Sequence, residues 1–205
     1  GGGRFDMGML HYMPQTWTSD NTDALCRCQI QYSTSLVFPP FAMGSHVSAV
    51  PNHQTGRSTP LATRAAVAMS GTYGYELDLT ALSDEEKELI RQQVDEYHRY
   101  YNVINRGDLY RLIMPNDTYN GKQGKCAAWI YVSVDKSEAL LTFVVMRTSV
   151  KPVYFLNLQG LDPTAQYRDE ESGRIYHGDT LMKAGLNLTR RYTDGDSMVV
   201  HLKKV

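Results

Sequence analysis

The chain has 205 residues, of which 42% are hydrophobic and 21% charged, and its formal net charge is -1 at pH 7. This composition is ordinary for a globular protein, and the near-neutral charge gives no reason to expect nucleic acid or an anionic membrane as a partner. No segment approaches the roughly 18 consecutive apolar residues of a membrane helix. The cysteines, Cys26, Cys28 and Cys126, suit neither a disulfide framework nor a zinc site. We therefore expect a cytoplasmic protein with no metal and no cofactor.

The first part of the chain alternates strand and helix signals. Residues 7–14 (MGMLHYMP) predict a short buried strand that ends at Pro14, and a polar loop follows. A helix is expected from Asp23 to about Val37, with Asn21, Thr22 or Asp23 as its N-cap. Residues 41–52 predict another strand that runs into a polar loop. Residues 60–71 mix helix and strand signals, and residues 70–82 are rich in glycine and aromatic side chains.

The strongest local signal predicts a long helix over residues 83–104. Ser83 and Glu86 have the spacing of a capping box, in which each side chain bonds the backbone of the other residue. Apolar side chains then recur at helical spacing. This predicted stripe consists of Ile90, Val94, Tyr97, Tyr101 and Ile104.

The pattern changes near residues 114–125, a polar segment rich in glycine and asparagine. Short apolar runs separated by turn residues follow, which predicts an antiparallel sheet or sandwich. We therefore place a domain boundary between residues 116 and 117. The expected fold class is α/β over residues 1–116, followed by an all-β domain, an antiparallel β-sandwich, over residues 117–205.

Strands followed by polar loops are typical of parallel α/β folds such as the (β/α)8 barrel, whose catalytic residues lie at the strand ends. A whole barrel takes about 250 residues, so residues 1–116 are too few to close one. We expect these residues to form the last strands and helices of a barrel, with further units upstream.

Two long segments, QTWTSDNTDA and MGSHVSAVPNHQ, together with the opening GGGRFDMGML, resemble the retaining α-galactosidases of glycoside hydrolase family 36. The resemblance covers nearly the whole chain. It implies a (β/α)8 barrel with a C-terminal antiparallel β domain. It also implies hydrolysis of terminal α-linked galactose from oligosaccharides such as melibiose and raffinose, with retention of configuration.

The resemblance also implies roles for individual residues. Such enzymes use two carboxyl groups, a nucleophile and an acid/base. The aspartate of the WTSD motif is the acid/base, which is Asp20 here, whereas the nucleophile lies in an upstream motif that this chain does not contain. Gly1 and Arg4 match a sugar-binding motif. Trp17 would offer an apolar ring to the sugar.

Other interpretations of these residues stay open. Without the resemblance, SDNTD is most simply a helix cap, and replacing Asp23 would cost about 0.5–2 kcal/mol, the worth of such a cap. The spacing of His46 and His53, seven positions apart, favours structural roles over zinc binding. The chain could also belong to a galactosyl-transferring relative, or be a non-catalytic fragment that binds sugar or serves assembly. We expect a homo-oligomeric parent enzyme and no activity from the 205 residues alone.

Overall fold

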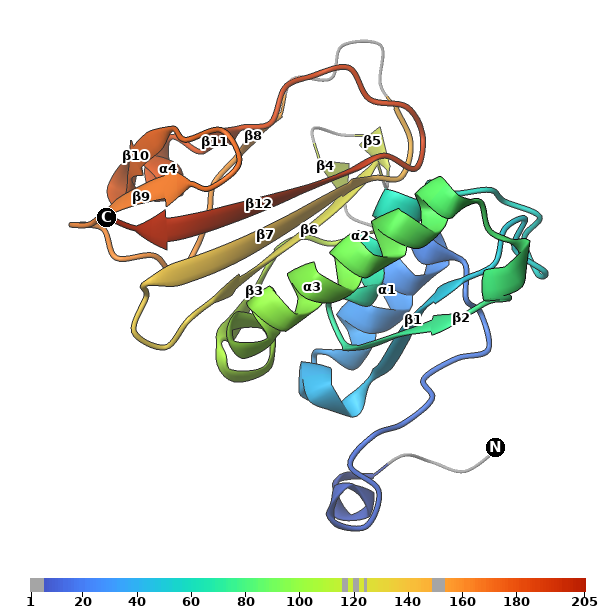
Figure 1. The fold of residues 1–205 in the computed structure, drawn as a ribbon. Coiled ribbons are helices and arrows are strands. Elements are labelled where there is room, and N and C mark those ends of the chain that lie inside the picture. The colour runs from blue at the N-terminus through green and yellow to red at the C-terminus, as the bar shows by residue number, and fades with distance from the viewer. Residues whose placement is uncertain (1–5, 116–117, 120–121, 124, 149–153) are drawn as a thin grey trace. The chain divides into compact units, whose positions relative to one another are not determined.

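The computed structural model describes residues 6–115, 118–119, 122–123, 125–148 and 154–205 (Figure 1). The chain divides into two compact units, residues 1–97 and residues 98–205. Within the described residues, no helix combines the length and the apolar character that crossing a membrane requires.

The first unit is built around two parallel strands, β1 and β2, which a helix, α2, connects. Gly44 pairs with Thr72 at one end of the strands and Ser48 pairs with Glu76 at the other. Parallel strands need such a crossover connection, so the predicted α/β class is confirmed for this unit. The elements of the unit are η1 (Met7–His11), α1 (Ala24–Thr34), η2 (Pro40–Ala42), β1 (Gly44–Ser48), α2 (Leu61–Ala68), β2 (Thr72–Glu76) and η3 (Leu79–Ala81).

The two predicted helix caps are confirmed. Asp23 is the N-cap of α1, where its carboxylate accepts a hydrogen bond from the Cys26 backbone at 2.9 Å. At the start of α3 (Asp84–Arg106), the Ser83 backbone donates to Glu86 at 3.0 Å and the Glu86 backbone donates to Ser83 at 3.2 Å.

The predicted apolar stripe of α3 is wrong at Tyr101, which is 48% exposed. The neighbouring Tyr100 is buried in its place, together with Tyr97, Val103 and Ile104. An i, i+4 spacing carried along a long helix drifts around its axis, so the buried face shifts by one residue in the last turns.

The strand predicted over residues 7–14 is wrong. Met7–His11 form a short 3-10 helix whose side chains are largely exposed, and Asp6 caps it by accepting a hydrogen bond from the Met9 backbone. Strand pairing begins later, where Thr16 forms a parallel bridge with Met43 just before β1. An apolar run of this length does not by itself distinguish a strand from a helical turn.

The second unit contains a six-stranded sheet in the order β10-β9-β12-β7-β6-β3, and all its neighbouring strands are antiparallel (Figure 1). The predicted antiparallel sheet is thereby confirmed. Its strands are β3 (Asp108–Ile113), β6 (Cys126–Val132), β7 (Glu138–Val145), β9 (Gln166–Asp169), β10 (Ile175–His177) and β12 (Ser197–Lys204). The remaining elements are β4 (Thr118–Tyr119), β5 (Lys122–Gln123), β8 (Phe155–Leu156), α4 (Gly178–Lys183) and β11 (Leu186–Asn187).

The core of the second unit gathers apolar side chains from the six-stranded sheet, from the β8–β11 pair and from α4. Its second layer is therefore a strand pair with a helix, which is smaller than the second sheet of the expected sandwich. Because β3 pairs with β6, the sheet begins before residue 116. The domain boundary placed there stays a prediction.

Candidate active site

The polar segment Trp17–Asp23 lies between a strand bridge and a helix. Before it, the Thr16 backbone donates to Ala42 and the Gly44 backbone donates to Thr16, both at 2.8 Å. After it, α1 begins at Ala24. The segment turns through short local hydrogen bonds, from the Asn21 backbone to the Ser19 hydroxyl and from the Asp23 backbone to the Asn21 amide oxygen. Both ends are therefore fixed by regular structure, so its polar side chains are presented from a defined loop.

Asp20 and Trp17 are brought together in this loop. The Trp17 indole Nε1 donates a hydrogen bond to Asp20 Oδ1 at 3.1 Å. Both side chains are exposed, with Trp17 at 52%. Asp20 makes no cap to α1, because Asp23 holds that position. The carboxyl group of Asp20 is therefore oriented by a neighbour and still open to a ligand.

His46, on β1, lies directly behind Trp17. The two rings stack with centroids 4.2 Å apart and planes 10° apart. His46 is 9% exposed, and its Nε2 lies 2.9 Å from Glu76 Oε2 without the alignment of a hydrogen bond. Burial lowers the pKa of His46 more than the Glu76 carboxylate raises it, and the nearby Arg27 charge lowers it further. The imidazole is therefore neutral near pH 7.

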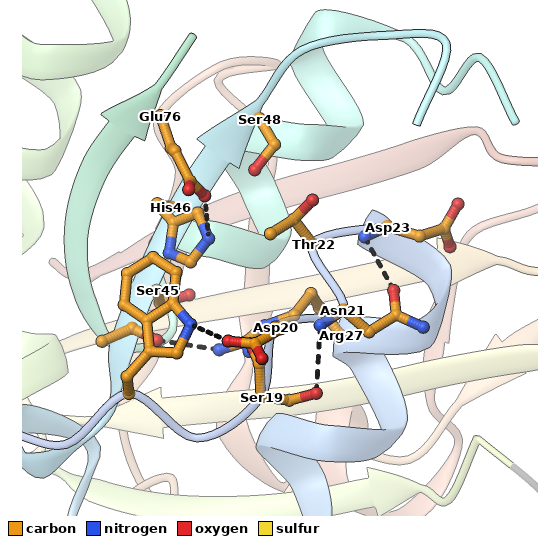
Figure 2. A network of polar contacts seen from close by, with 12 residues as sticks. Ser19, Asp20, Asn21, Thr22, Asp23, Arg27, Ser45, His46, Ser48 and Glu76 are labelled. Atoms are coloured by element: carbon orange, nitrogen blue, oxygen red, sulfur yellow. Dashed lines mark hydrogen bonds and ion pairs between the residues drawn. The ribbon is translucent and has the colours of Figure 1, made fainter. Parts of the chain in front are cut away.

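Arg27, on α1, lies beside the same loop and binds it (Figure 2). Its guanidinium donates to the Ser19 carbonyl at 3.3 Å, to the Gly44 carbonyl at 2.8 Å and to the Gln31 side chain at 3.1 Å. Arg27 is 2% exposed, and burial lowers its pKa to about 10. Gln31 extends the network by accepting a hydrogen bond from Ser45 at 2.9 Å. This buried polar network ties the loop to both α1 and β1.

The loop after β1, residues 49–59, contacts several residues of the polar segment Trp17–Asp23. The Gln54 side chain donates to the Asp20 carbonyl at 3.3 Å, and the Asn52 side chain donates to Thr22 Oγ1 at 3.0 Å. Thr55 and Arg57 of this loop bind the Asp23 carboxylate. The loop follows the carboxyl end of β1, the end of a parallel strand at which α/β folds commonly bind ligands, and it contacts the Asp20 backbone.

Asp23 is a structural carboxylate. It is 2% exposed, accepts a hydrogen bond from Thr55 at 2.9 Å and forms an ion pair with Arg57. Burial acts to raise its pKa, but the hydrogen bonds from Cys26 and Thr55 and the Arg57 charge outweigh burial, so the pKa of Asp23 lies below its ordinary value. Asp23 therefore does more than cap α1, because it also anchors the loop after β1.

Asn52 offers a test of this anchoring. It is 4% exposed, and its amide oxygen accepts hydrogen bonds from the backbones of Gln54 and Thr55, both at 3.0 Å. Asn52→Ala should lower the free energy of unfolding by about 1–3 kcal/mol, because it leaves buried groups unpaired. Thermal unfolding measures the loss, with the exposed Gln54→Ala as the matched control. Equal effects of the two substitutions would contradict the anchoring role.

Two of the four predicted site residues lie in the described part of the chain. The structure brings Asp20 and Trp17 together, whereas Gly1 and Arg4 lie outside the described residues. His46 is buried against Trp17 and His53 is exposed, so the two do not form a shared site. In the part of the chain that the structure describes, no three His, Cys, Asp or Glu side chains group as they would around a metal. Sequence reasoning missed Arg27 and the loop contacts, because one buried arginine carries no spacing signal.

Known families match both parts of the chain. The Melibiase model matches residues 1–107, and the model of the glycosyl hydrolase family 36 C-terminal domain matches residues 126–202. Alpha-galactosidase AgaA of Geobacillus stearothermophilus is 52% identical over 100% of this chain and 27% of its own length. Alpha-galactosidase Mel36A of Lactobacillus acidophilus is 44% identical with the same coverage. The chain thus spans about a quarter of the length of these relatives.

Solved structures agree with the sequence matches. The crystal structure of the Geobacillus AgaA matches 100% of this chain and 28% of that chain, with a TM-score of 0.93 and 51% identity. Crystal structures of AgaA variants in which an aspartate is replaced have been solved in complex with raffinose and with stachyose. The Melibiase model alone covers more than half of the chain. The chain therefore belongs to the melibiases of glycoside hydrolase family 36, and it matches their C-terminal part.

Proposed function

We propose that this chain is part of a retaining α-galactosidase, which releases terminal α-linked galactose from oligosaccharides such as raffinose, stachyose and melibiose. The observation that carries the proposal is the Asp20 carboxyl group. It is exposed, it accepts a hydrogen bond from the Trp17 indole, and its backbone carbonyl contacts Gln54 of the loop after β1. The names of the relatives and the sugars bound to AgaA support the substrate class.

Asp20 is the acid/base in this proposal. In the first step it gives its proton to the glycosidic oxygen while the bond from that oxygen to galactose breaks and a nucleophilic carboxylate bonds to the sugar. In the second step Asp20 takes a proton from the water that releases galactose. The nucleophile belongs to another part of the enzyme. An exposed carboxyl group suits both steps, because the leaving oxygen and the water must each reach it.

The first unit would then form the last strands and helices of a (β/α)8 barrel. Its strand–helix–strand unit, β1–α2–β2, and the parallel Thr16–Met43 bridge support this proposal. Eight such strands close a barrel, so the others would come from elsewhere in the enzyme. The loop that holds Asp20 would lie on the catalytic face of that barrel.

We also propose that the enzyme works in the cytoplasm as a homo-oligomer. The three cysteines are free, which supports a reducing compartment. The oligomer rests on the family resemblance, and light scattering of the complete protein tests it.

The main proposal is tested by assaying two proteins for activity. One is the complete protein that contains this sequence, and the other is the 205-residue chain alone. The complete protein should release galactose from raffinose and from an aryl α-galactoside. The chain alone should release none, because it lacks the nucleophile that the proposal assigns elsewhere. An inactive complete protein would overturn the proposal, and steady turnover by the chain alone would contradict the division of the catalytic residues.

A further inference from the structure

Trp17 is fixed in two ways that a simple sugar-stacking residue does not need. His46 covers one face of the indole at 4.2 Å, with the ring planes only 10° apart. The edge of the same indole donates its single N–H to Asp20 Oδ1 at 3.1 Å. Trp17 thus contacts His46 through one face of its ring and Asp20 through its edge. His46 therefore fixes the plane of the indole, and the indole N–H in that plane is directed at Asp20.

His46 is well suited to set that plane. It is 9% exposed and lies on β1, whose five residues are all buried. Its Nε2 lies 2.9 Å from Glu76 Oε2, and in the described part of the chain its Nδ1 has no hydrogen-bond partner. The ring is thus held by its stack on Trp17 and by its close approach to the Glu76 carboxylate. A buried ring on a strand moves little, so the indole stacked on it is held still as well.

We propose that Trp17 and His46 are positioning residues that orient the Asp20 carboxyl group, so that Oδ1 accepts the indole N–H and Oδ2 carries the proton that is transferred. This inference rests on the proposed function of Asp20. An N–H donor is best met by the oxygen that bears no proton, which leaves the proton on Oδ2. Oδ2 then gives it to the leaving oxygen, and after the first step Oδ2 takes a proton from water.

The proposal separates two roles that Trp17 could have. If the ring only binds sugar, a phenyl ring at the same position should keep most of its function. If the N–H orients Asp20, a phenyl ring should lose that role while it keeps the stack with His46. Trp17→Phe is therefore the decisive variant, and because Trp17 is 52% exposed, the substitution leaves the core intact.

In the complete enzyme, Trp17→Phe should lower kcat for raffinose about 10- to 100-fold, the effect of losing a hydrogen bond to a carboxyl group that becomes charged as it gives up its proton, with little change in KM. An aryl galactoside with a good leaving group needs little acid help in the first step. It should still form the glycosyl-enzyme at nearly the normal rate, and this intermediate should accumulate.

Three further variants complete the test. Trp129→Phe makes the same change at the other tryptophan, which is buried in β6, and should leave the ratio between the two substrates unchanged. His46→Ala removes the stacked ring and should reproduce the loss on raffinose, whereas His46→Phe keeps a flat ring and should largely preserve the ratio. Titration with a covalent inactivator counts the folded active sites in each preparation.

The outcomes are distinct. A loss on raffinose with retained formation of the intermediate supports the positioning role. An equal loss on both substrates after Trp17→Phe, or a rise in KM alone, would overturn it and leave the α-galactosidase assignment standing. A wild-type enzyme without α-galactosidase activity would instead overturn the proposed function.

Discussion

Asp20→Ala in the complete enzyme should slow the hydrolysis of raffinose by about 10²- to 10⁴-fold, the usual contribution of an acid/base residue. The leaving group of raffinose is a sugar alkoxide, which departs only when it gains a proton. With an activated aryl galactoside, the first step needs no proton, but the second step still needs the base. Rapid-quench measurements should therefore show a burst of released phenol followed by very slow turnover.

Azide gives this prediction its sharpest form. It is a small anionic nucleophile that needs no base, and it fits the space that the carboxylate leaves. Turnover of the activated substrate should recover with increasing azide, and the product should be the α-galactosyl azide, because attack on the covalent intermediate restores the original configuration. Absence of rescue would show that another carboxyl group is the acid/base.

Of the two carboxylates of WTSDNTDA, the structure assigns the helix cap to Asp23 and gives Asp20 no part in it. Asp23 is the helix cap, buried and ion-paired, whereas Asp20 is exposed and accepts a hydrogen bond from the Trp17 indole. The general preference for a cap in such a segment is therefore correct for Asp23. The same preference says nothing of Asp20, because a helix needs only one cap.

The elements with strong local signals could be predicted from the sequence. The Ser83–Glu86 capping box and the Asp23 cap both depend on residues three positions apart, so their hydrogen bonds are visible in the sequence. The β runs of the second unit were also recognisable, because turn residues separate them. Residues 7–14 carry no such signal, and the predicted strand was wrong there.

The supports of the candidate site could not be predicted, because they join residues that are far apart in the chain. Arg27 reaches Gly44, Asn52 reaches Thr22, and His46 stacks on Trp17. No periodicity or spacing rule connects such pairs. The family resemblance predicted Asp20 as the acid/base, and only the structure shows which side chains contact it.

Asp23→Ala should chiefly lower stability, and by more than the loss of a cap alone. The sequence suggested about 0.5–2 kcal/mol, but the carboxylate also binds Thr55 and Arg57, so we expect a loss of about 2–4 kcal/mol in the free energy of unfolding. Amide hydrogen exchange should speed up in the first turn of α1 and in the loop after β1. The matched control is Asp78→Ala, which removes an exposed cap from η3 and should cost much less.

The pH dependence of that loss follows from the lowered pKa of Asp23. A carboxyl group whose pKa is lower in the folded state contributes stability above its unfolded value and loses it as the pH falls through its folded value. The gap in stability between wild type and Asp23→Asn should thus be largest near neutral pH and shrink below about pH 4, close to the ordinary value for aspartate. Active sites that remain folded at pH 7 should keep nearly normal turnover, unlike those of Asp20→Ala. A gap that does not change with pH would contradict the role of the charged Asp23 carboxylate in stability. A larger loss of turnover per folded site than that of Asp20→Ala would show that the roles of the two carboxylates are exchanged.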